Sequence, residues 1–343
     1  MGGVQIGGRQ TILQNSRLNQ ILDSMAGRRV LVVGDVMMDE YVWGNVRRIS
    51  PEAPVMVVEV ERDSYNPGGA ANVVNNIQAL GGFSSMIGVV GDDDAGRKLA
   101  SRLAEIGVDV SGIVADNSRP TTRKTRIIAH SQQVVRVDRE SRRRLPRHVT
   151  KELAIRLADG IASADIIVFS DYDKGIAVRE VTQVVLDLGR KHRKRVLVNP
   201  KPRNIKQFKS ASVISLNQAE AESATGMPIA DERSLHRAAK RLLTSLQPEK
   251  LLITRGPLGM SLFDMNAEVE TVPAHPVEVY DVAGAGDTVV GVLALALAAG
   301  ATMLEAAVLA NCAGGAVVRK VGVATVNRDE IAALLNRERS NSR

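Results

Sequence analysis

Short, strongly apolar segments alternate with segments of helical periodicity through the second half of this chain, and this alternation restricts the fold more than any other feature. The apolar segments are rich in Val, Ile and Leu, and they predict strands at 165–171, 194–200, 211–217 and 250–256. Strands that are apolar on both sides belong in a parallel sheet with right-handed helical crossovers on its two faces. The sequence therefore predicts an α/β fold with a mainly parallel central sheet and helices on both faces. Two apolar helices, about 286–299 and 303–319, are expected to complete the core.

Extended segments in the first half of the chain do not follow this alternation. Val-rich and Ile-rich stretches within about 40–66 and 108–138 predict short strands joined by turns. We interpret them as a small β lid beside the ligand site. Residues 1–24 are polar and rich in Gln and Asn, which predicts a loosely held N-terminal leader, and residues 25–343 are expected to form a single domain.

Composition narrows the class of protein. Cys312 is the one cysteine, so a disulfide framework is excluded and a reducing compartment is expected. No apolar signal peptide opens the chain. An uncharged run from Thr288 to Leu304 falls just short of membrane-spanning length and is bracketed by Asp287 and Glu305, so it predicts a buried core helix. We expect a protein of the cytoplasm without a membrane partner.

The chain is basic, with a formal net charge of +7 and a sequence pI of about 9.7. Arginines gather in one stretch, at positions 136, 139, 142, 143, 144 and 147. Such a run is usually a solvated basic face, and no nucleic-acid reading module or set of stacking aromatics accompanies it. The charge is therefore consistent with acidic small molecules as partners, and we expect no nucleic-acid partner.

Polar residues and glycines follow most of the predicted strands directly. In parallel α/β sheets, ligands bind beyond the carboxyl ends of the strands, so these residues are expected to share one cleft. The positions are Gly34-Asp35, Ser170-Asp171, Asn199-Pro200-Lys201, Asn217 and Thr254-Arg255-Gly256.

The stretch DVAGAGDTVVG at 281–291 places Asp287 after three small residues, Gly284, Ala285 and Gly286, and at the start of an apolar helix. Glycines let backbone amides approach a ligand, and the first N–H groups of a helix lack intrahelical partners. An anion hole beside a carboxylate suits phosphoryl transfer, in which charge spreads over the moving phosphoryl group. The alternative is that the glycines only allow close packing and that Asp287 caps the helix.

Three motifs resemble those of the ribokinase/PfkB carbohydrate kinase family. DVAGAGDT (281–288) is similar to its C-terminal signature, NPGGAANVVNNIQALGG (66–82) to its N-terminal signature, and NQAE (217–220) to its N-x-x-E motif. The resemblance covers about residues 28–326 and implies a ribokinase-like fold, with ATP and Mg²⁺ as cofactors.

The resemblance also implies roles for individual residues. Asp287 would be the base that takes a proton from the sugar hydroxyl, and the amides from Ala283 to Gly286 would hold the phosphates. Asn217 and Glu220 would organise Mg²⁺ through water, although an Asn with a Glu three residues later also fits a capping box. The nucleotide would lie against Asn217, Gln218, Ala219, Glu220, Thr254, Gly256, Gly259 and Asn311.

At the sugar end, Asp39 sits where the family grips sugar hydroxyls, although an aspartate there can also form a turn. Gly68, Gly69 and Asn72 would approach the sugar closely. Within the family, residues 34–55 and SDYDKG (170–175) look most similar to D-glycero-β-D-manno-heptose-7-phosphate kinases. That similarity implies phosphorylation of the anomeric hydroxyl to the 1,7-bisphosphate, for ADP-heptose and lipopolysaccharide core synthesis.

The 7-phosphate of such a substrate needs cations. Candidates are Lys174, which we favour, and Arg47, Arg48, Lys124, Arg126 and Arg136. The chain ends soon after the motifs, so we expect the stand-alone kinase form. The resemblance also implies a homodimer paired through the lids, and the sequence permits it, because Val55, Val57 and Val60 supply an apolar face that one small sheet could not bury alone. Two alternatives stay open: a kinase of another sugar, phosphosugar or nucleoside, and a non-catalytic sugar- or nucleotide-binding regulator.

Overall fold

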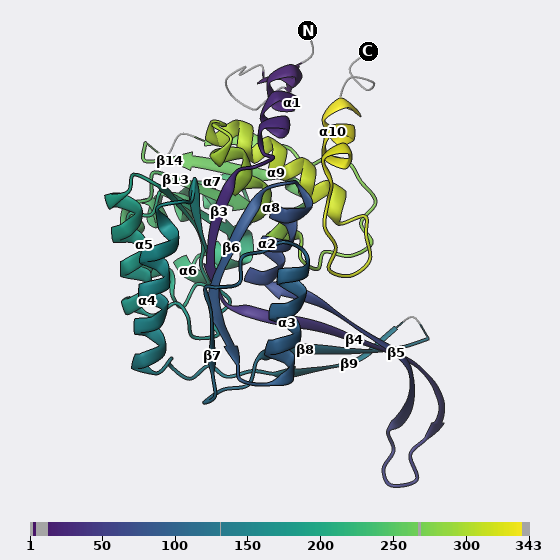
Figure 1. Cartoon of the computed structure of the whole chain (residues 1–343). Helices are drawn as coiled ribbons and strands as arrows, with labels where there is room; N and C mark the ends of the chain where they lie inside the picture. The colour runs from purple at the N-terminus through teal and green to yellow at the C-terminus, as the bar shows by residue number, and fades with distance from the viewer. Residues whose placement is uncertain (1–2, 5–12, 131, 267–268, 338–343) are drawn as a thin grey trace.

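A large, mainly parallel sheet runs through the centre of the protein (Figure 1). The computed structural model describes residues 3–4, 13–130, 132–266 and 269–337. Within them the strand order is β15-β14-β13-β12-β11-β10-β3-β6-β7, and only β14 and β15 pair antiparallel to their neighbours. The fold predicted from the sequence is confirmed. The strands are β3 (Arg29–Gly34), β6 (Phe83–Gly91), β7 (Ile113–Asp116), β10 (Ile166–Ser170), β11 (Arg195–Asn199), β12 (Val213–Asn217), β13 (Lys250–Thr254), β14 (Met260–Asp264) and β15 (Val269–Val272).

Helices cover both faces of this sheet because its inner strands are apolar on both sides. In β10, Ile166 and Val168 pack into one core, while Ile167 and Phe169 pack into the other. The first core lies under α1 (Asn15–Ser24), α2 (Ala70–Ala79), α3 (Asp94–Glu105), α8 (Ala285–Ala298), α9 (Met303–Val317) and α10 (Arg328–Arg337). The second lies under α4 (Arg147–Ile161), α5 (Arg179–Lys191), α6 (Gln218–Thr225) and α7 (Glu232–Leu246).

The apolar run from Thr288 to Leu304 is buried inside the first core, as predicted. It breaks near Gly300 into α8 and the start of α9, because Thr302 caps α9 with its side chain on the N–H of Glu305. Among the described residues, none of the helices combines the length and the apolarity that crossing a bilayer requires.

A second, smaller sheet projects from the main body and forms the lid (Figure 1). Its order is β5-β4-β8-β9, with bounds β4 (Val36–Ile49), β5 (Met56–Gly69), β8 (Thr122–Ala129) and β9 (Gln132–Arg139). The first lid segment, predicted at 40–66, corresponds to β4 and β5, which begin at Val36 and end at Gly69. The second begins at Thr122 rather than at 108, because β7 pairs with β6 at the edge of the main sheet. The sequence of β7 does not reveal this, since an edge strand of either sheet has the same pattern.

The predicted N-terminal leader also differs from the structure. Residues 15–24 form helix α1, in which Leu18, Ile21 and Leu22 are buried against the core. Asn15 donates a hydrogen bond to the carbonyl of Leu335 at 3.0 Å, which links α1 to α10. The apolar stripe at i, i+3 and i+4 outweighs the polar composition of this segment. The rest of the predicted leader, apart from residues 3–4 and 13–14, lies outside the described residues.

Candidate active site

The first turn of α8 places the carboxylate of Asp287 in a buried, hydrogen-bonded position. Its side chain accepts a hydrogen bond from Asn72 Nδ2 at 2.9 Å and another from the hydroxyl of Tyr172. The residue before the helix, Gly284, has a φ of 77°, and a Cβ there would lie 2.7 Å from Asn72 Nδ2. Glycine is therefore required at 284 for α2 and α8 to bring Asn72 and Asp287 together.

Burial raises the pKa of Asp287 from 3.8 to about 6. The hydrogen bonds from Tyr172 and Asn72 act in the opposite direction because they stabilise the charged form, and the negative charge of Asp39 raises the pKa further. A carboxylate with this pKa is ionised at neutral pH and is a stronger base than an exposed aspartate. Asp287 is thus suited to accept a proton.

The backbone amides before Asp287 are not all available to a ligand. The N–H of Ala283 donates to Asp281 Oδ1 at 2.9 Å, and the N–H of Ala285 donates to the carbonyl of Val282 at 3.2 Å. The predicted anion hole therefore differs at these two positions, because Asp281 forms an Asx turn with the loop. Among the hydrogen bonds of the described residues, none uses the N–H of Gly284, Gly286 or Asp287. These three amides form the open part of the loop.

Tyr172 was missed by sequence reasoning, although it lies two residues after the end of β10. The loop that carries it is held by the buried carboxylate of Asp35, which accepts hydrogen bonds from the N–H groups of Tyr172, Lys174 and Ile176 at 2.7, 3.1 and 3.3 Å. Burial, followed by the charge of Asp171, raises the pKa of Asp35 to about 6. The position of Tyr172 after a strand of the parallel sheet was the available signal.

Lys201 is a second residue that sequence reasoning left without a role. Its backbone N–H donates to Asp171 Oδ2 at 2.9 Å, which fixes the loop after β11. Its ammonium lies 2.6 Å from Glu220 Oε1 and 5.1 Å from the ring centroid of Tyr172. The positive charge of Lys201 lowers the pKa of Asp287. Lys201 thus connects the surroundings of Asp287 to the N-x-x-E motif.

At the start of the lid, Asp39 is buried and forms an ion pair with Arg126 of β8. Gly68 of β5 lies beside it, and a Cβ there would come 2.1 Å from Asp39 Oδ2. Gly69 has a φ of 56°, and a Cβ there would lie 2.6 Å from Met37 Cε. The two glycines therefore allow β5 to run directly against Asp39, and the carboxylates of Asp39 and Asp287 interact electrostatically.

Cations gather next to Asp39. Lys174 is buried, with its ammonium 2.7 Å from Glu140 Oε2. Burial lowers the pKa of Lys124, and the nearby positive charges of Lys174 and Arg136 lower it further. Arg136 also forms two hydrogen bonds with Asp138, at 2.9 and 3.1 Å. Carboxylates partly offset this positive charge: Glu140 pairs with Lys174, Asp138 pairs with Arg136, and the charges of Asp138 and Asp39 raise the pKa of Lys124.

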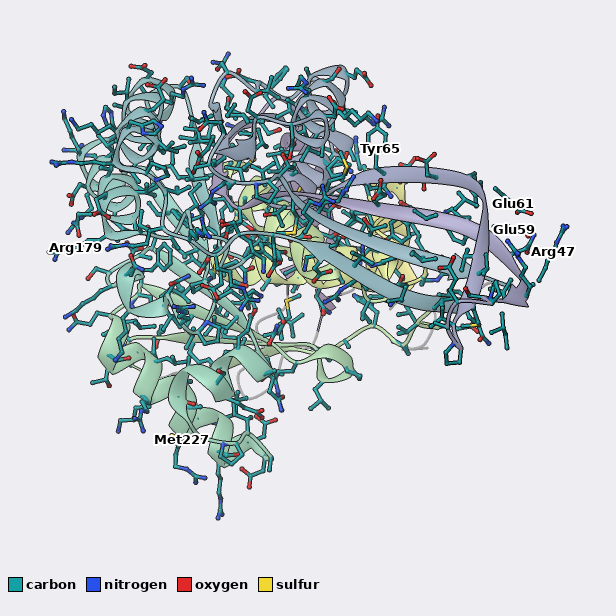
Figure 2. All side chains as sticks on the ribbon, turned by 90° about the horizontal axis from the view of Figure 1, so that it is seen from below. Arg47, Glu59, Glu61, Tyr65, Arg179 and Met227 are labelled. Atoms are coloured by element: carbon teal, nitrogen blue, oxygen red, sulfur yellow. The ribbon has the colours of Figure 1, made fainter. Side chains whose placement is uncertain are left out.

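Arg47 is not brought to this cluster. It lies at the tip of the lid with an exposed side chain, 3.8 Å from Glu59 (Figure 2). It lies eight positions along β4 from Asp39, which is roughly 26 Å at about 3.3 Å per residue of strand. The sequence does not reveal the distance between Arg47 and Asp39, because the residues around Arg47 do not show how far the strand extends.

The N-x-x-E motif forms the capping box that the sequence left as an alternative. Glu220 Oε2 accepts from the N–H of Asn217 at 2.9 Å, and Asn217 Oδ1 accepts from the N–H of Glu220 at 2.8 Å. Within the described part of the chain, no cluster of three His, Cys, Asp or Glu residues could enclose a metal. Mg²⁺ commonly keeps its waters and binds through one carboxylate and substrate phosphates. Glu220 supplies one such carboxylate and fits this mode of binding. Its other oxygen, Oε1, accepts a hydrogen bond from the ammonium of Lys201.

The other predicted nucleotide residues lie at the end of β13 and in the turn that follows it, in the first turn of α6 and in the middle of α9. Gly259 has a φ of 82°, and a Cβ there would lie 2.0 Å from the carbonyl oxygen of Val272. Asn311 donates from Nδ2 to the carbonyl of Pro273 at 2.7 Å. These two residues thus hold the segment after β15. Thr254 is the last residue of β13, and Gly256 begins an exposed 3₁₀ turn. In α6, Gln218 donates hydrogen bonds to the carbonyl of Ile229 and to the carboxylate of Glu222, whereas Ala219 is exposed.

Comparison with known proteins defines the class to which this fold and site belong. The family model described as pfkB family carbohydrate kinase matches residues 28–337, so the chain belongs to that family. The prediction of an ATP-dependent carbohydrate kinase is confirmed at this level. Solved structures with the same fold include Arabidopsis thaliana ribokinase complexed with ribose and ATP (TM-score 0.70, 20% identity, 90% of this chain and 99% of that one). Escherichia coli phosphofructokinase-2 in complex with fructose-6-phosphate is another (TM-score 0.74, 20% identity, 92% and 100%).

Curated relatives are more similar in sequence. The chain is 46% identical over 307 residues to the protein named "Bifunctional protein HldE" of Desulfatibacillum aliphaticivorans, which covers 90% of this chain and 63% of that protein. It is 42% identical over 313 residues to the protein of the same name in Helicobacter hepaticus, covering 91% and 65%. The chain therefore spans less than two thirds of the length of these relatives.

Proposed function

We propose that this kinase phosphorylates the anomeric hydroxyl of D-glycero-D-manno-heptose 7-phosphate, giving the 1,7-bisphosphate for ADP-heptose and lipopolysaccharide core synthesis. The observation that carries the proposal is the cationic cluster of Lys124, Arg136 and Lys174 beside Asp39. A sugar that bears a phosphate at one end explains why cations gather there. The identity of 42–46% to proteins named HldE supports the same substrate.

In the proposed reaction, Asp39 accepts hydrogen bonds from sugar hydroxyls and the cations bind the 7-phosphate. The anomeric hydroxyl faces Asp287. Its oxygen forms a bond to the γ-phosphorus of ATP while the bond from phosphorus to the ADP oxygen breaks, and its proton passes to Asp287 Oδ. Catalysis of this kind depends on positioning and on charge stabilisation. The open amides of Gly284, Gly286 and Asp287 would donate to the phosphoryl oxygens.

Mg²⁺ bound with ATP supplies charge neutralisation for the phosphates. Glu220, together with Asn217, would hold the ion through water, and Lys201 would keep the carboxylate of Glu220 oriented. Nucleotide contacts at Thr254, Gly256 and Gly259 belong to the same proposal.

The substrate proposal is tested by measuring kcat/KM for the heptose 7-phosphate, fructose 6-phosphate, fructose, ribose and adenosine. We expect the heptose 7-phosphate to be preferred at least 100-fold. A preference for any of the others would assign the chain to a kinase of another sugar, phosphosugar or nucleoside. Binding of ATP and sugar without turnover would support the non-catalytic regulator instead.

We also propose a homodimer formed through the lids. Val55 and Val60 are 56% and 62% exposed on the first lid hairpin, and Val135 and Val137 of β9 are 44% and 52% exposed. Apolar residues on a small sheet favour burial against a second copy. The mass in solution tests this, and a monomer at micromolar concentration would contradict it.

A further inference from the structure

A cavity of about 570 Å³ lies outside the active site, between the start of α5, the 3₁₀ helix η1 (Ile205–Phe208) and the segment 142–144. Neither Asp39 nor Asp287 lines it. We call it the basic cleft because of seven cationic residues in its wall: Arg142, Arg144, Arg179, Arg190, Arg203, Lys206 and Lys209. Arg190 is paired with Asp187 at 2.6 Å. Figure 2 shows Arg179 on the side of the molecule opposite the tip of the lid, which carries Arg47.

The positive charge of the basic cleft is only partly compensated. Asp173 is the one carboxylate in its wall, and it lies 3.7 Å from Arg203 Nη1. Among the described residues, no ion pair involves Arg144, Arg179, Lys206 or Lys209. The 13-residue helix α5 begins at the cleft and adds the positive end of its dipole. A concave surface lined by one sign of charge concentrates the field and attracts counter-ions.

The wall of the cleft is held in place by groups that also reach the active site. The guanidinium of Arg119 donates to the carbonyls of Lys174 and Arg143 at 2.9 and 2.6 Å. Glu140 pairs with Lys174 through one oxygen, at 2.7 Å, and with Arg142 through the other, at 3.1 Å. These contacts hold the backbone near residues 143 and 174, whereas the side chains of Arg142 and Arg203 are 61% and 74% exposed.

The lining also restricts the chemistry of a ligand. The cavity has a volume typical of small-molecule sites, which is about 300–1,000 Å³. No Phe, Tyr or Trp is among its lining residues in the described part of the chain, so a nucleobase would find no aromatic surface on which to stack. Arginines bind phosphate groups in bidentate fashion. The lining thus favours a compact compound with several phosphate charges and no aromatic ring.

We propose that the basic cleft is a second ligand site, separate from the catalytic cleft, that binds a small polyanion of the sugar bisphosphate class. The proposal goes beyond the kinase reaction and does not depend on the identity of the sugar that is phosphorylated. It also gives a role to Arg142 and Arg144, which sequence analysis interpreted as part of a solvated basic face.

Binding of fructose 1,6-bisphosphate, measured by isothermal titration calorimetry at low and at physiological salt, tests the proposal. The cleft variant carries Arg144→Ser, Arg179→Ser and Lys206→Ser. The matched control carries Arg233→Ser, Arg237→Ser and Lys240→Ser on the exposed face of α7, so that both lose three positive charges. We expect the cleft variant to bind the probe at least tenfold more weakly, and the control to bind as the unaltered protein does.

A third variant, Lys124→Met with Arg136→Met, separates the two sites because these cations lie on the lid strands β8 and β9 and neither lines the basic cleft. We expect it to retain the calorimetric signal. The proposal is overturned if the unaltered protein does not bind the probe, or if both serine variants weaken binding equally, which would indicate net charge alone. Loss of binding in the Lys124/Arg136 variant, with retention in the cleft variant, would place the probe in the catalytic cleft and overturn the proposal as well. None of these readouts requires kinase activity.

Discussion

Replacing Tyr172 by Phe removes one of two hydrogen bonds that stabilise the ionised carboxylate of Asp287. Burial keeps the pKa of Tyr172 well above 10, so its hydroxyl remains a neutral donor across the working pH range. A hydrogen bond to a charged group contributes about 1.5–3 kcal/mol, and one pKa unit corresponds to about 1.4 kcal/mol. The substitution should therefore raise the pKa of Asp287 from about 6 by roughly 1–2 units.

The consequence appears in the pH dependence of kcat/KM. Asp287 accepts a proton only when ionised, so the rate falls as the pH drops through the pKa of its carboxyl group. With the pKa at about 6, roughly three quarters of Asp287 is ionised at pH 6.5, whereas with a pKa of about 7.5 roughly a tenth is ionised. We expect kcat/KM of Tyr172→Phe to be about eightfold lower at pH 6.5 and almost unchanged at pH 9.

Initial rates from pH 5 to 9.5, with ADP release coupled to a second enzyme, give the midpoint of the acidic limb. Tyr65→Phe is the matched control, because Tyr65 lies on the lid, is 41% exposed and does not contact Asp287 (Figure 2). An unchanged midpoint in Tyr172→Phe would refute the reasoning. A uniform loss of rate at every pH would show that Tyr172 positions the substrate and does not set the pKa of the base.

Three further predictions follow from the same site. Asp287→Asn should lower kcat/KM by about 10²–10⁴. Above pH 6 the same substitution should raise the free energy of unfolding by up to about 3 kcal/mol, because burial penalises the ionised carboxylate. This gain should vanish toward pH 4, and urea unfolding at several pH values would reveal it. Arg126→Met should raise the KM for the sugar substrate at least tenfold, whereas Arg47→Met should leave it unchanged. If steady-state kinetics gave equal KM values for the two variants, the placement of Arg47 at the lid tip would be contradicted. Gly68→Ala should also raise that KM, because the added methyl displaces the carboxylate of Asp39; a KM equal to that of the unaltered protein would show that Asp39 does not need its present position.

Much of the architecture follows from patterns that are local in the chain. The doubly apolar strands, the glycine-flanked helix starts and the order of the motifs are each visible within a few residues, and they predicted the parallel sheet, α8 and the position of Asp287. The lid was also predicted, because its Val-rich segments interrupt the alternation of strand and helix. Such features depend on periodicity and backbone preference, which neighbouring residues determine.

The contacts that tune the site connect residues far apart in the chain, and only the tertiary structure decides them. Tyr172 and Asn72 reach Asp287 across 115 and 215 positions of sequence, and the resulting pKa depends on burial, which no motif displays. The same holds for Arg47, which a long strand carries away from Asp39, and for Ala285, whose amide is occupied within the loop. Sequence determined which residues could perform the chemistry. Folding determined which of them meet, because distance and desolvation arise only when remote segments pack together.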